Sequence, residues 1–322
     1  MFIGSNLMTG LVFKSTGSWY TVKTLNGKVY QCRIKGKFRI KGIKSTNPIA
    51  VGDYVEFELE TKNNTVTGVI NNIRERKNYI VRKSVNLSKQ IHIIAANIDQ
   101  VFLLITINNP TTYTSFIDRF LVTAEAYHIP AILLFNKSDL IVEQQNKKRK
   151  ELIQAYTEIG YQCLEISATT QFNLKSLKQL MTDKVSMFSG HSGVGKSTLI
   201  NILDPDLKLD TKKVSLQHKQ GQHTTTFAEM FSLPFGGYII DTPGIKGFGI
   251  VDMNIQEIGD YFPEFFRLKS HCKFNNCLHI NEPNCAIKKA VEAEKITEWR
   301  YQNYMQLIND EETTYRTDIY ST

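Results

Sequence analysis

The segment Gly190–Ser197 has the residue types and the spacing of a phosphate-binding loop. It reads Gly-His-Ser-Gly-Val-Gly-Lys-Ser, which fits the pattern G-x-x-x-x-G-K-S. Glycines let such a loop curl so that successive backbone N–H groups point at phosphate oxygens. The Lys196 ammonium would reach the β- and γ-phosphates, and the Ser197 hydroxyl would ligate Mg²⁺. The predicted nucleotide contacts here are Gly190, His191, Ser192, Gly193, Val194, Gly195, Lys196, Ser197 and Thr198.

The residues around this loop predict the elements that hold it. Residues 184–188 are typical of a strand, and residues 196–203 are typical of a helix. A further strand at 238–240 leads into Asp241-Thr242-Pro243-Gly244. A carboxylate at the end of a buried strand beside a phosphate loop suits indirect Mg²⁺ coordination. The Gly244 N–H could meet the γ-phosphate and move when that phosphate leaves. For Gly190–Ser197, the alternative to a phosphate-binding loop is a chance glycine-rich turn. The predicted strand before it and helix after it make that alternative the weaker one.

The tetrapeptide Asn136-Lys137-Ser138-Asp139 follows an apolar strand at 131–135 and predicts recognition of guanine. The Asp139 carboxylate can accept hydrogen bonds from both the N1–H and the exocyclic amine of guanine, a donor pair that adenine lacks. The Lys137 stem would pack over the base. Asn136 would tie this loop to the phosphate loop.

Two further segments predict contacts with the same nucleotide. Ser167 and Ala168 follow a strand at 163–166 and would place a backbone N–H near guanine O6, although this pair is weak on its own. Gly221-Gln222-His223-Thr224-Thr225-Thr226 lies between the phosphate loop and Asp241, where a Thr hydroxyl must reach Mg²⁺. Three consecutive threonines leave the choice open. We predict that Thr225 is the Mg²⁺ ligand. The alternative is that this segment binds no ion and is only a polar loop leading into the next strand.

Four side chains that commonly bind metals lie close together near the C-terminus. They are Cys272, Cys277, His279 and Cys285, with the spacing C-x4-C-x-H-x5-C. Three thiolates and one imidazole form a closed tetrahedral site with no open position, so we expect one structural Zn²⁺. Buried free cysteines beside a surface histidine are the alternative, which the clustering disfavours. The neighbouring His271 could be confused with the fourth ligand.

The predicted elements divide the chain into three parts. Residues 1–72 read as about five short strands with an Asn26-Gly27 hairpin signal, which predicts a small closed barrel such as an OB-fold. Residues 71–90 are polar and basic and read as a linker. From residue 91 to about 250, buried-type strands alternate with helices, the pattern of a parallel α/β domain. After the Cys/His cluster, residues 286–308 read as one charged amphipathic helix.

Positive charge is concentrated at the N-terminal end. The 322 residues carry a net charge of +8, whereas residues 1–90 alone carry +11 and the remainder −3. Basic and apolar residues alternate from Arg33 to Lys41, which on a strand would line one face with cations. Such a face attracts phosphate backbones through counterion release. We therefore expect this domain to contact RNA, with a solvated basic strand as the alternative.

The composition excludes several classes of protein. With 42% hydrophobic and 22% charged residues, the chain is neither collagen-like nor disordered. Its longest strongly apolar run, 101–107, is far shorter than the roughly 20 residues that a membrane helix needs. The first residues lack the pattern of a signal peptide, and five cysteines are too few for a disulfide scaffold. We expect a cytoplasmic protein without membrane contact, and a monomer because no heptad repeat is present.

The nucleotide motifs are those of a guanine-nucleotide switch protein, but their order is unusual. The base-reading motifs precede the phosphate loop, whereas a standard switch GTPase begins with that loop. A circularly permuted chain can assemble the same sheet because the termini of compact domains often lie close together. The segment after Asp241 then leads directly into the Cys/His region. Loss of the γ-phosphate could therefore move a whole appended domain.

With its motifs in this order, the sequence resembles the ribosome small subunit-dependent GTPase A family (RsgA, YjeQ or YloQ) of circularly permuted bacterial GTPases. The resemblance covers nearly the whole chain and includes the basic β-domain in front and the Cys/His cluster behind. It implies a multidomain α/β protein. The implied parts are an OB-fold RNA-binding domain at 1–72, a circularly permuted P-loop GTPase domain at 73–250 and an α-helical zinc-binding domain at 251–322.

The resemblance also implies a role. It implies a late-acting factor in maturation of the small ribosomal subunit, whose GTPase activity that subunit stimulates. The implied ligands are GTP or GDP, Mg²⁺ and one structural Zn²⁺. The implied partner is the small ribosomal subunit with its rRNA.

The hydrolysis step is the least determined by the sequence. Many switch GTPases place a water-orienting Gln just after the D-x-x-G motif, but here Gly244 is followed by Ile245. His223, beside the Thr segment, is the catalytic candidate because a neutral imidazole could orient or deprotonate water. Packing or RNA contact by His223 is an equally supported alternative.

Three other functions remain open on the sequence. A GTP-controlled RNA switch of another class, such as a translation factor or an RNA chaperone, would carry the same motifs without depending on the small subunit. A P-loop ATPase or kinase is disfavoured by Asn136–Asp139. A non-enzymatic RNA-binding module is disfavoured because Lys196, Ser197 and Asp241 are all present.

Overall fold

The computed structural model describes residues 7–34, 48–62, 64–83, 91–207, 228–241 and 253–317. The chain forms two compact units, each built from segments that are far apart in the sequence. The first contains the described parts of Met1–Val101, Lys175–Phe188 and Ile200–Ile245. The second contains those of Phe102–Leu174, Ser189–Leu199 and Lys246–Thr322.

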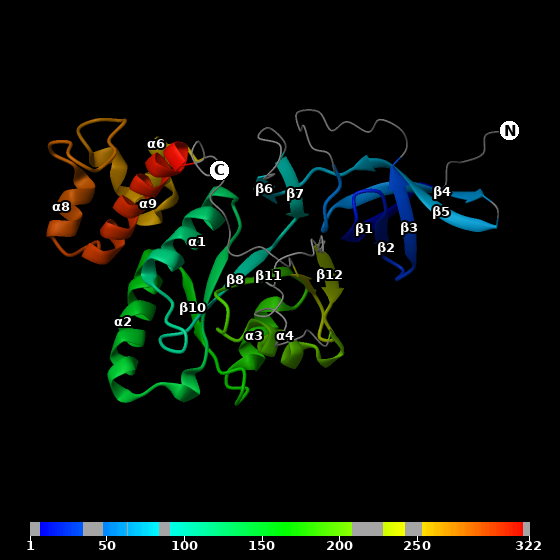
Figure 1. The fold of residues 1–322 in the computed structure, drawn as a ribbon, viewed down its shortest axis with the longest axis horizontal. Helices are drawn as coiled ribbons and strands as arrows, with labels where there is room; N and C mark the ends of the chain where they lie inside the picture. Colours follow the sequence, from blue (N-terminus) through cyan, green and yellow to red (C-terminus); the bar gives the residue numbers. More distant parts are fainter. Residues whose placement is uncertain are drawn as a thin grey trace. The chain divides into compact units, whose positions relative to one another are not determined.

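Five strands of the first unit close into the predicted barrel (Figure 1). They are β1 (Met8–Ser15), β2 (Tyr20–Thr24), β3 (Val29–Ile34), β4 (Tyr54–Lys62) and β5 (Thr65–Ile73). Their order is β1-β2-β3-β5-β4, and pairing of β1 with β4 closes the sheet as in an OB-fold. Alternating side chains such as Val22, Phe57 and Ile70 fill the interior, because successive residues of a strand point to opposite faces.

A hairpin follows the barrel where the sequence predicts a linker at 71–90. It consists of β6 (Tyr79–Lys83) and β7 (Ile91–Ala96), which pair antiparallel. The linker interpretation is wrong for residues 71–73 and 79–83: β5 continues to Ile73, and β6 gains backbone pairing with β7. Polar composition alone did not reveal this pairing, because a short strand with an apolar partner needs no apolar run of its own.

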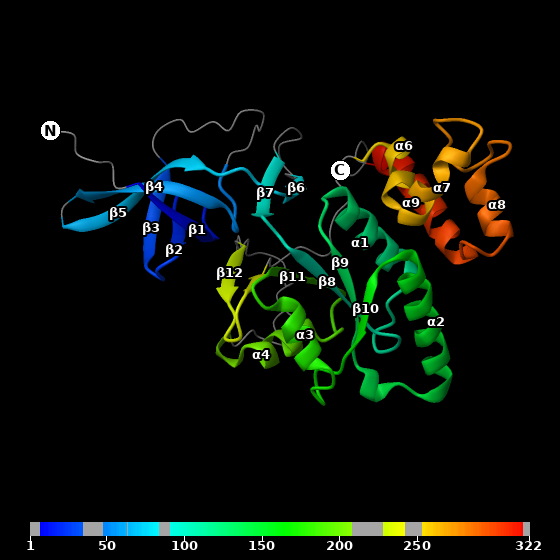
Figure 2. The same cartoon turned by 180° about the vertical axis from the view of Figure 1, so that it is seen from behind.

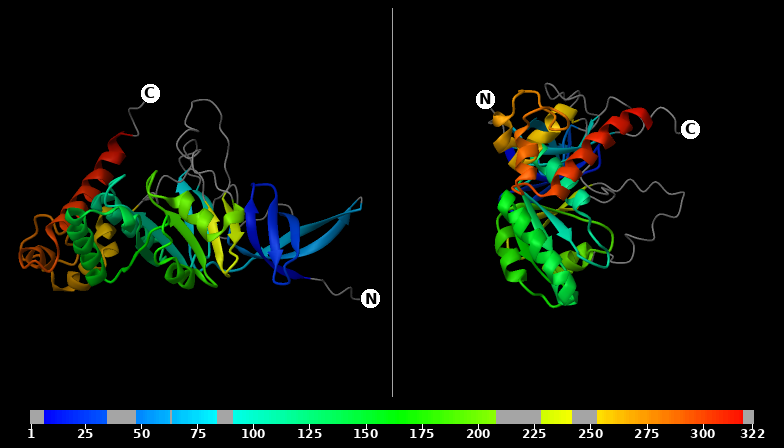
Figure 3. Two further views of the ribbon diagram at one scale, coloured as in Figure 1. Left: turned by 90° about the horizontal axis from the view of Figure 1, so that it is seen from below. Right: turned by 90° about the vertical axis from the view of Figure 1, so that its left-hand side faces the viewer.

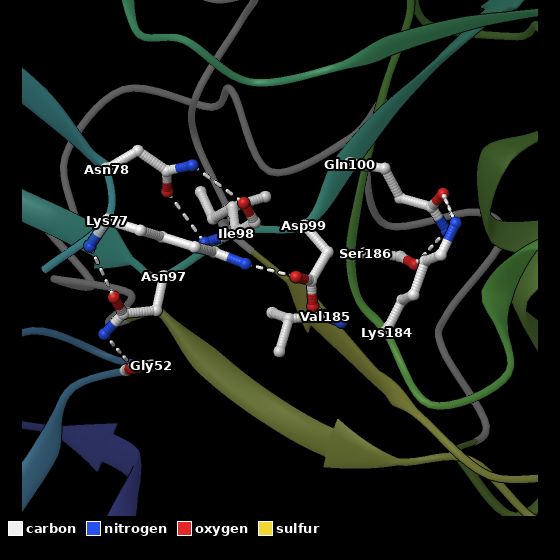
Figure 4. Close-up of polar contacts among 10 residues, drawn as sticks. All are labelled: Gly52, Lys77, Asn78, Asn97, Ile98, Asp99, Gln100, Lys184, Val185 and Ser186. Carbon is white, nitrogen blue, oxygen red and sulfur yellow. Dashed lines mark hydrogen bonds and ion pairs between the residues drawn. The ribbon is translucent and has the colours of Figure 1, made fainter.

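Two asparagines join this hairpin to the barrel and to the start of the next strand (Figure 4). The Asn97 side chain accepts the Lys77 N–H at 3.0 Å and donates to the Gly52 carbonyl at 2.9 Å. The Asn78 side chain makes two 2.8 Å hydrogen bonds with the backbone of Ile98. Both asparagine side chains are buried, so these bonds hold the segments in one arrangement.

Polar contacts also fix the beginning of β11 (Val185–Ser189), the strand that leads to the phosphate loop. The Asp99 carboxylate accepts the Val185 N–H at 2.7 Å, and the Gln100 side chain donates to the Ser186 hydroxyl at 3.0 Å (Figure 4). Beside β11 lie β13 (Tyr238–Asp241) and β12 (Glu229–Ser232), in the order β11-β13-β12-β1. The sheet of the barrel thus continues into β12, β13 and β11.

The second unit contains alternating strands and helices (Figure 1). These are β8 (Gln100–Ile105), α1 (Thr114–Ala126), β9 (Ala131–Phe135), η1 (Ser138–Leu140), α2 (Glu143–Ile159) and β10 (Gln162–Glu165). The strand order is β10-β9-β8, and β9 pairs with β10 in parallel. Every residue of β8 is buried, as the continuous apolar run predicts for a parallel sheet covered on both faces.

The chain continues through α3 (Leu174–Met181), α4 (Lys196–Leu203) and η2 (Pro205–Leu207). The C-terminal region, residues 253–317, then contributes α6 (Ile255–Ile258), η3 (Gly259–Tyr261), α7 (Pro263–Leu268), η4 (Lys269–His271), α8 (Ala286–Glu292) and α9 (Glu298–Thr317) (Figure 2). Among the described residues, no helix has both the length and the apolar character needed to cross a membrane.

The prediction of one helix over residues 286–308 is wrong, because α8 ends at Glu292 and α9 begins at Glu298. Glu294 has a φ of +56°, which ends a right-handed helix. The Ala290 carbonyl accepts the N–H groups of both Lys295 and Ile296, and this reverses the chain. Ile296 is thereby buried in the core of the C-terminal region.

The junction between barrel and hairpin should not tolerate a side chain at Gly52. Its φ is +91°, and a Cβ would lie 2.1 Å from the Ala96 carbonyl oxygen. We expect Gly52→Ala to lower the free energy of unfolding by about 2–5 kcal/mol. The cost of a positive φ for alanine and the cost of the clash with the Ala96 carbonyl oxygen should add to each other. Gly17→Ala is the matched control, because Gly17 has a φ of +87° with no described atom within 4 Å. Chemical denaturation measures the free energy of unfolding of both variants. An equal decrease in Gly52→Ala and Gly17→Ala would contradict the close approach of Gly52 to the Ala96 carbonyl.

Candidate functional site

The phosphate loop connects β11 to α4, and glycines determine its shape. Gly190, Gly193 and Gly195 have φ values of +145°, +84° and +98°, which other residues rarely adopt. A Cβ at Gly195 would lie 2.6 Å from Asn136 Nδ2, and one at Gly190 would lie 2.8 Å from the Leu104 carbonyl oxygen. The loop therefore approaches its neighbours too closely for a side chain at either position.

The Lys196 ammonium lies inside the curve of the loop. Its Nζ donates to the Gly190 carbonyl and, at 3.3 Å, to the His191 carbonyl. The loop thus holds a positive charge where it could meet phosphate oxygens. Of the other predicted contacts, Val194 is buried, Ser197 is half-buried, and Ser192 and Thr198 are exposed.

Asn136 joins the base-reading loop, Asn136–Asp139, to two other loops. Its Nδ2 donates to the Val194 carbonyl at 2.8 Å, and its Oδ1 accepts the Ala168 N–H at 3.1 Å. The side chain is buried, so losing these bonds would leave polar groups unsatisfied. The structure brings the base-reading loop, the phosphate loop and the Ser167–Ala168 segment together around this amide.

Lys137 makes a second bridge to the phosphate loop. Its φ is +60°, and its Nζ donates to the carbonyls of Gly193 at 2.8 Å and Asn109 at 2.6 Å. Asp139 lies in η1 and is exposed. The ammonium therefore fixes the loop, while the carboxylate faces solvent where a base could reach it.

Ser167 and Ala168 are both buried after β10. The Ser167 hydroxyl accepts the Thr170 N–H at 3.1 Å, which shapes the turn. The Ala168 N–H is occupied by Asn136. The segment thus supports the base-reading loop in this structure.

Sequence reasoning missed the loop between β8 and α1, which packs against the phosphate loop. Pro110 Cδ lies 3.4 Å from where a Gly193 Cβ would be, and Asn109 supplies the carbonyl that Lys137 binds. The only sequence signal is the turn-forming Asn108-Asn109-Pro110 directly after a buried strand.

Asp241 is the last residue of β13 in the first unit. β13 runs parallel to β11 with Ile240 opposite Met187, so Asp241 and Phe188 lie at the same edge of the sheet. That edge is where ligands bind in open α/β sheets. The predicted residues His223, Thr225 and Gly244 lie outside the described residues.

The four predicted metal ligands come together in the C-terminal region. The ligand atoms of Cys272, Cys277, His279 and Cys285 all lie within 4.8 Å of one another. His279 Nδ1 is 3.3 Å from Cys285 Sγ and 3.7 Å from Cys272 Sγ. Three sulfur atoms and one imidazole nitrogen are the donor set of a closed zinc site. The exposed His271 is not part of the cluster.

Without a cation, the electrostatics of this Cys/His cluster favour neutral side chains. Burial raises the pKa of Cys277 to about 12 and raises the pKa of Cys285. Burial lowers the pKa of His279, which favours the neutral imidazole that metals bind. A divalent ion would reverse the penalty on the thiolates, since its charge stabilises them directly.

Helix α9 supports the loop that carries these ligands. The Tyr301 hydroxyl donates to the His279 carbonyl at 2.7 Å, and the Tyr304 hydroxyl donates to the Leu278 carbonyl at 2.6 Å. Such contacts orient ligands from outside the coordination shell.

Two models of protein families match the sequence. The sequence model of the family described as RsgA GTPase matches residues 73–251, and that of the RsgA N-terminal domain matches residues 9–70.

The chain belongs to the RsgA GTPase family.

Relatives in this family match almost end to end. A protein named "Small ribosomal subunit biogenesis GTPase RsgA" from Flavobacterium johnsoniae is 66% identical over 97% of this chain and 96% of its own. A protein of the same name from Bacteroides fragilis is 54% identical over 95% of this chain and 97% of its own.

Two solved structures of the RsgA type share the fold. The crystal structure of YjeQ from Thermotoga maritima has a TM-score of 0.77 and 35% identity, and the match covers 94% of this chain and 98% of that one. The crystal structure of YloQ, a circularly permuted GTPase, has a TM-score of 0.76 and 30% identity, and the match covers 98% of both chains. The predicted circular permutation and fold class are confirmed.

Metal analysis of the purified RsgA-family chain tests the cluster directly. We expect about one zinc ion per chain, because four ligands close one tetrahedral site. Cys277→Ser should remove most of the bound zinc. Cys163→Ser is the control, since Cys163 is partly buried but is not one of the clustered ligands. Full zinc content in Cys277→Ser, or an equal loss in both variants, would contradict the assignment.

Proposed function

We propose that this RsgA-family GTPase binds the small ribosomal subunit, assists its late maturation and hydrolyses GTP to GDP and phosphate in a subunit-stimulated manner. The names of its 66% and 54% identical relatives support this role. The observation that carries the nucleotide part is the bridging by Asn136 and Lys137. These two side chains join the base-reading loop to the phosphate loop, so one nucleotide can contact both.

The proposed roles follow from the chemistry of each side chain. Asp139 would read guanine and Lys196 would neutralise phosphate charge. The Ser197 and Thr225 hydroxyls would ligate Mg²⁺ and Asp241 would hold it indirectly, and the ion would neutralise charge on the β- and γ-phosphates. The remaining proposed contacts are Asn136, Lys137, Ser167, Ala168, Gly190, His191, Ser192, Gly193, Val194, Gly195, Thr198 and Gly244.

In the reaction, a water oxygen attacks the γ-phosphorus and the bond to the β–γ bridging oxygen breaks. The electron pair stays with GDP, while one proton of the water remains on the released phosphate and the other passes to solvent. His223 is proposed to orient that water as a neutral imidazole, since Ile245 cannot. Positioning supplies most of the acceleration in such reactions, so turnover without the ribosome should be slow.

We further propose a division of labour along the chain. Residues 1–72 would contact rRNA, residues 73–250 would carry the GTPase, and residues 251–322 would hold one structural Zn²⁺. The protein would act as a monomer in the cytoplasm, the compartment that its ribosomal role requires. The net charge of +11 on residues 1–90 supports the rRNA contact.

Steady-state hydrolysis with purified small ribosomal subunits tests the proposed function. We expect slow turnover of GTP alone and strong stimulation by small subunits, with large subunits and ATP as inactive controls. His223→Ala should retain GTP binding and lose the stimulated rate by about 10²–10⁴-fold if its imidazole acts on water.

Slow GTP turnover that neither subunit changes would leave the GTPase but contradict the small-subunit role. A GTP-controlled RNA switch of another class would then be the better account. An unchanged stimulated rate in His223→Ala would remove that residue from the mechanism and leave the rest of the proposal intact.

A groove on the barrel surface supports contact with unpaired RNA. It has a volume of about 580 Å³ and is lined by Trp19, Val29, Tyr30, Gln31, Thr65, Val66 and Thr67. The Trp19 side chain is 45% exposed, which leaves its ring available for stacking. Aromatic rings in a basic domain are typical platforms for unpaired bases.

We expect Trp19→Ala to weaken binding of a single-stranded oligoribonucleotide to the full chain by about five- to a hundredfold, because base stacking is lost. The salt dependence should stay unchanged, since no phosphate contact is removed. Trp19→Phe should retain most of the affinity. Tyr79→Ala is the control, as Tyr79 is similarly exposed outside the groove. Equal affinities in titrations of Trp19→Ala and Tyr79→Ala would contradict the stacking role.

A further inference from the structure

Helix α1 contacts the phosphate loop at its first turn. The rings of Phe116 and His191 lie with centroids 3.8 Å apart and planes inclined by 32°. His191 Nε2 is buried and has no hydrogen-bond partner within the described part of the chain. Stacking on Phe116, rather than a hydrogen bond at this nitrogen, therefore orients the ring.

Two residues further along α1, Asp118 is held by the C-terminal helix α9. Its carboxylate accepts from Arg300 Nη1, from Asn303 Nδ2 at 2.6 Å and from the Tyr156 hydroxyl at 2.7 Å. Arg300 also donates to Glu264 of α7 at 2.7 Å. All these side chains are buried. Breaking such a pair is costly, so α1 and α9 should hold a fixed relation.

Apolar packing reinforces this attachment. Val122 of α1 belongs to the same core cluster as Phe262, Phe265 and Tyr304 of the C-terminal region. Figure 3 shows α9, in red, lying beside α1. One face of α1 is therefore part of the C-terminal core, while its first turn touches the phosphate loop.

The same helix α9 supports the Cys/His cluster through Tyr301 and Tyr304. A continuous series of contacts thus runs from the cluster through α9 and α1 to the phosphate loop. Within this series, Phe116 and His191 form the contact between α1 and the phosphate loop.

We propose that Phe116 and His191 are positioning residues for GTP hydrolysis, and that α1 transmits to them the position of the C-terminal region through Asp118. This inference rests on the proposed GTPase function and adds a regulation of the same site. A partner that shifts α9 would alter the phosphate loop, and nucleotide binding would favour one position of α9 by the same free energy.

The ring contact is tested by substitutions of Phe116 in the full chain. Phe116→Leu keeps the volume but removes the ring, and we expect KM for GTP to rise several-fold with a smaller change in kcat. Phe116→Tyr keeps the ring and should recover most of the affinity. Combining Phe116→Leu with His191→Ala should do little more than either change alone, because both remove the same contact.

The transmission is tested at Asn303. Asn303→Ala removes one hydrogen bond to Asp118, and we expect KM for GTP to rise about two- to thirtyfold. Gln302→Ala, at an exposed neighbouring position of α9, is the matched control and should match the unsubstituted chain. Tyr156→Phe removes another hydrogen bond to the same carboxylate. It replaces Asn303→Ala as the test variant if Asn303→Ala strongly lowers the melting temperature.

Amide hydrogen exchange without nucleotide gives a second readout that needs no catalysis. Asn303→Ala should speed exchange in residues 190–197, and it should not do so when Phe116→Leu is already present. Unchanged exchange and unchanged KM in Asn303→Ala would overturn the transmission even if GTP is hydrolysed. If Asn303→Ala speeds exchange in residues 190–197 but the unsubstituted chain hydrolyses no GTP, the transmission through α1 stands and the proposed function is overturned.

Discussion

The predicted nucleotide site depends on one buried carboxamide, the side chain of Asn136. It bonds the Val194 carbonyl, 58 residues away, and the Ala168 N–H, 32 residues away. A buried amide must satisfy its donors and acceptors to avoid a large desolvation penalty, so three loops share one arrangement. The bridge depends on where the loops lie at the sheet edge and not on their order along the chain. This is why a permuted chain can build the same guanine-nucleotide site.

A second buried group, the Asp118 carboxylate, attaches the C-terminal region to helix α1. The Asp118 carboxylate of α1 is fully enclosed, and Arg300 compensates its charge. The C-terminal region is therefore not merely tethered behind the core, because it shares a hydrophobic cluster with α1. A metal ion held by the Cys/His cluster would add a local crosslink to a region whose helices, apart from α9, are short. The helix that contacts the phosphate loop through Phe116 is thus also held in the C-terminal core.

Much of the candidate site could be proposed from the sequence because its signals are local. The glycines at 190, 193 and 195 indicate backbone conformations with positive φ. Asn136–Asp139 and the Cys/His cluster each indicate a type of binding chemistry from residues close together in the sequence. The predicted strands and helices of the α/β core were confirmed for the same reason, since hydrophobic periodicity is a local property. The error over residues 286–308 shows the limit: helical periodicity continues across 293–297, but burial of Ile296 required a break.

The sequence by itself determined the class of the molecule: a permuted guanine-nucleotide fold with a β-barrel in front and a metal-type cluster behind. Only the tertiary structure decided which groups hold that site in place. Arg300 and Asp118 are 182 residues apart, and Phe116 reaches His191 across 75 positions, so no periodicity or motif connects either pair. Their interaction arises when packing brings distant segments together and excludes water from them. Such contacts cannot be read from spacing, because burial is a property of the folded chain.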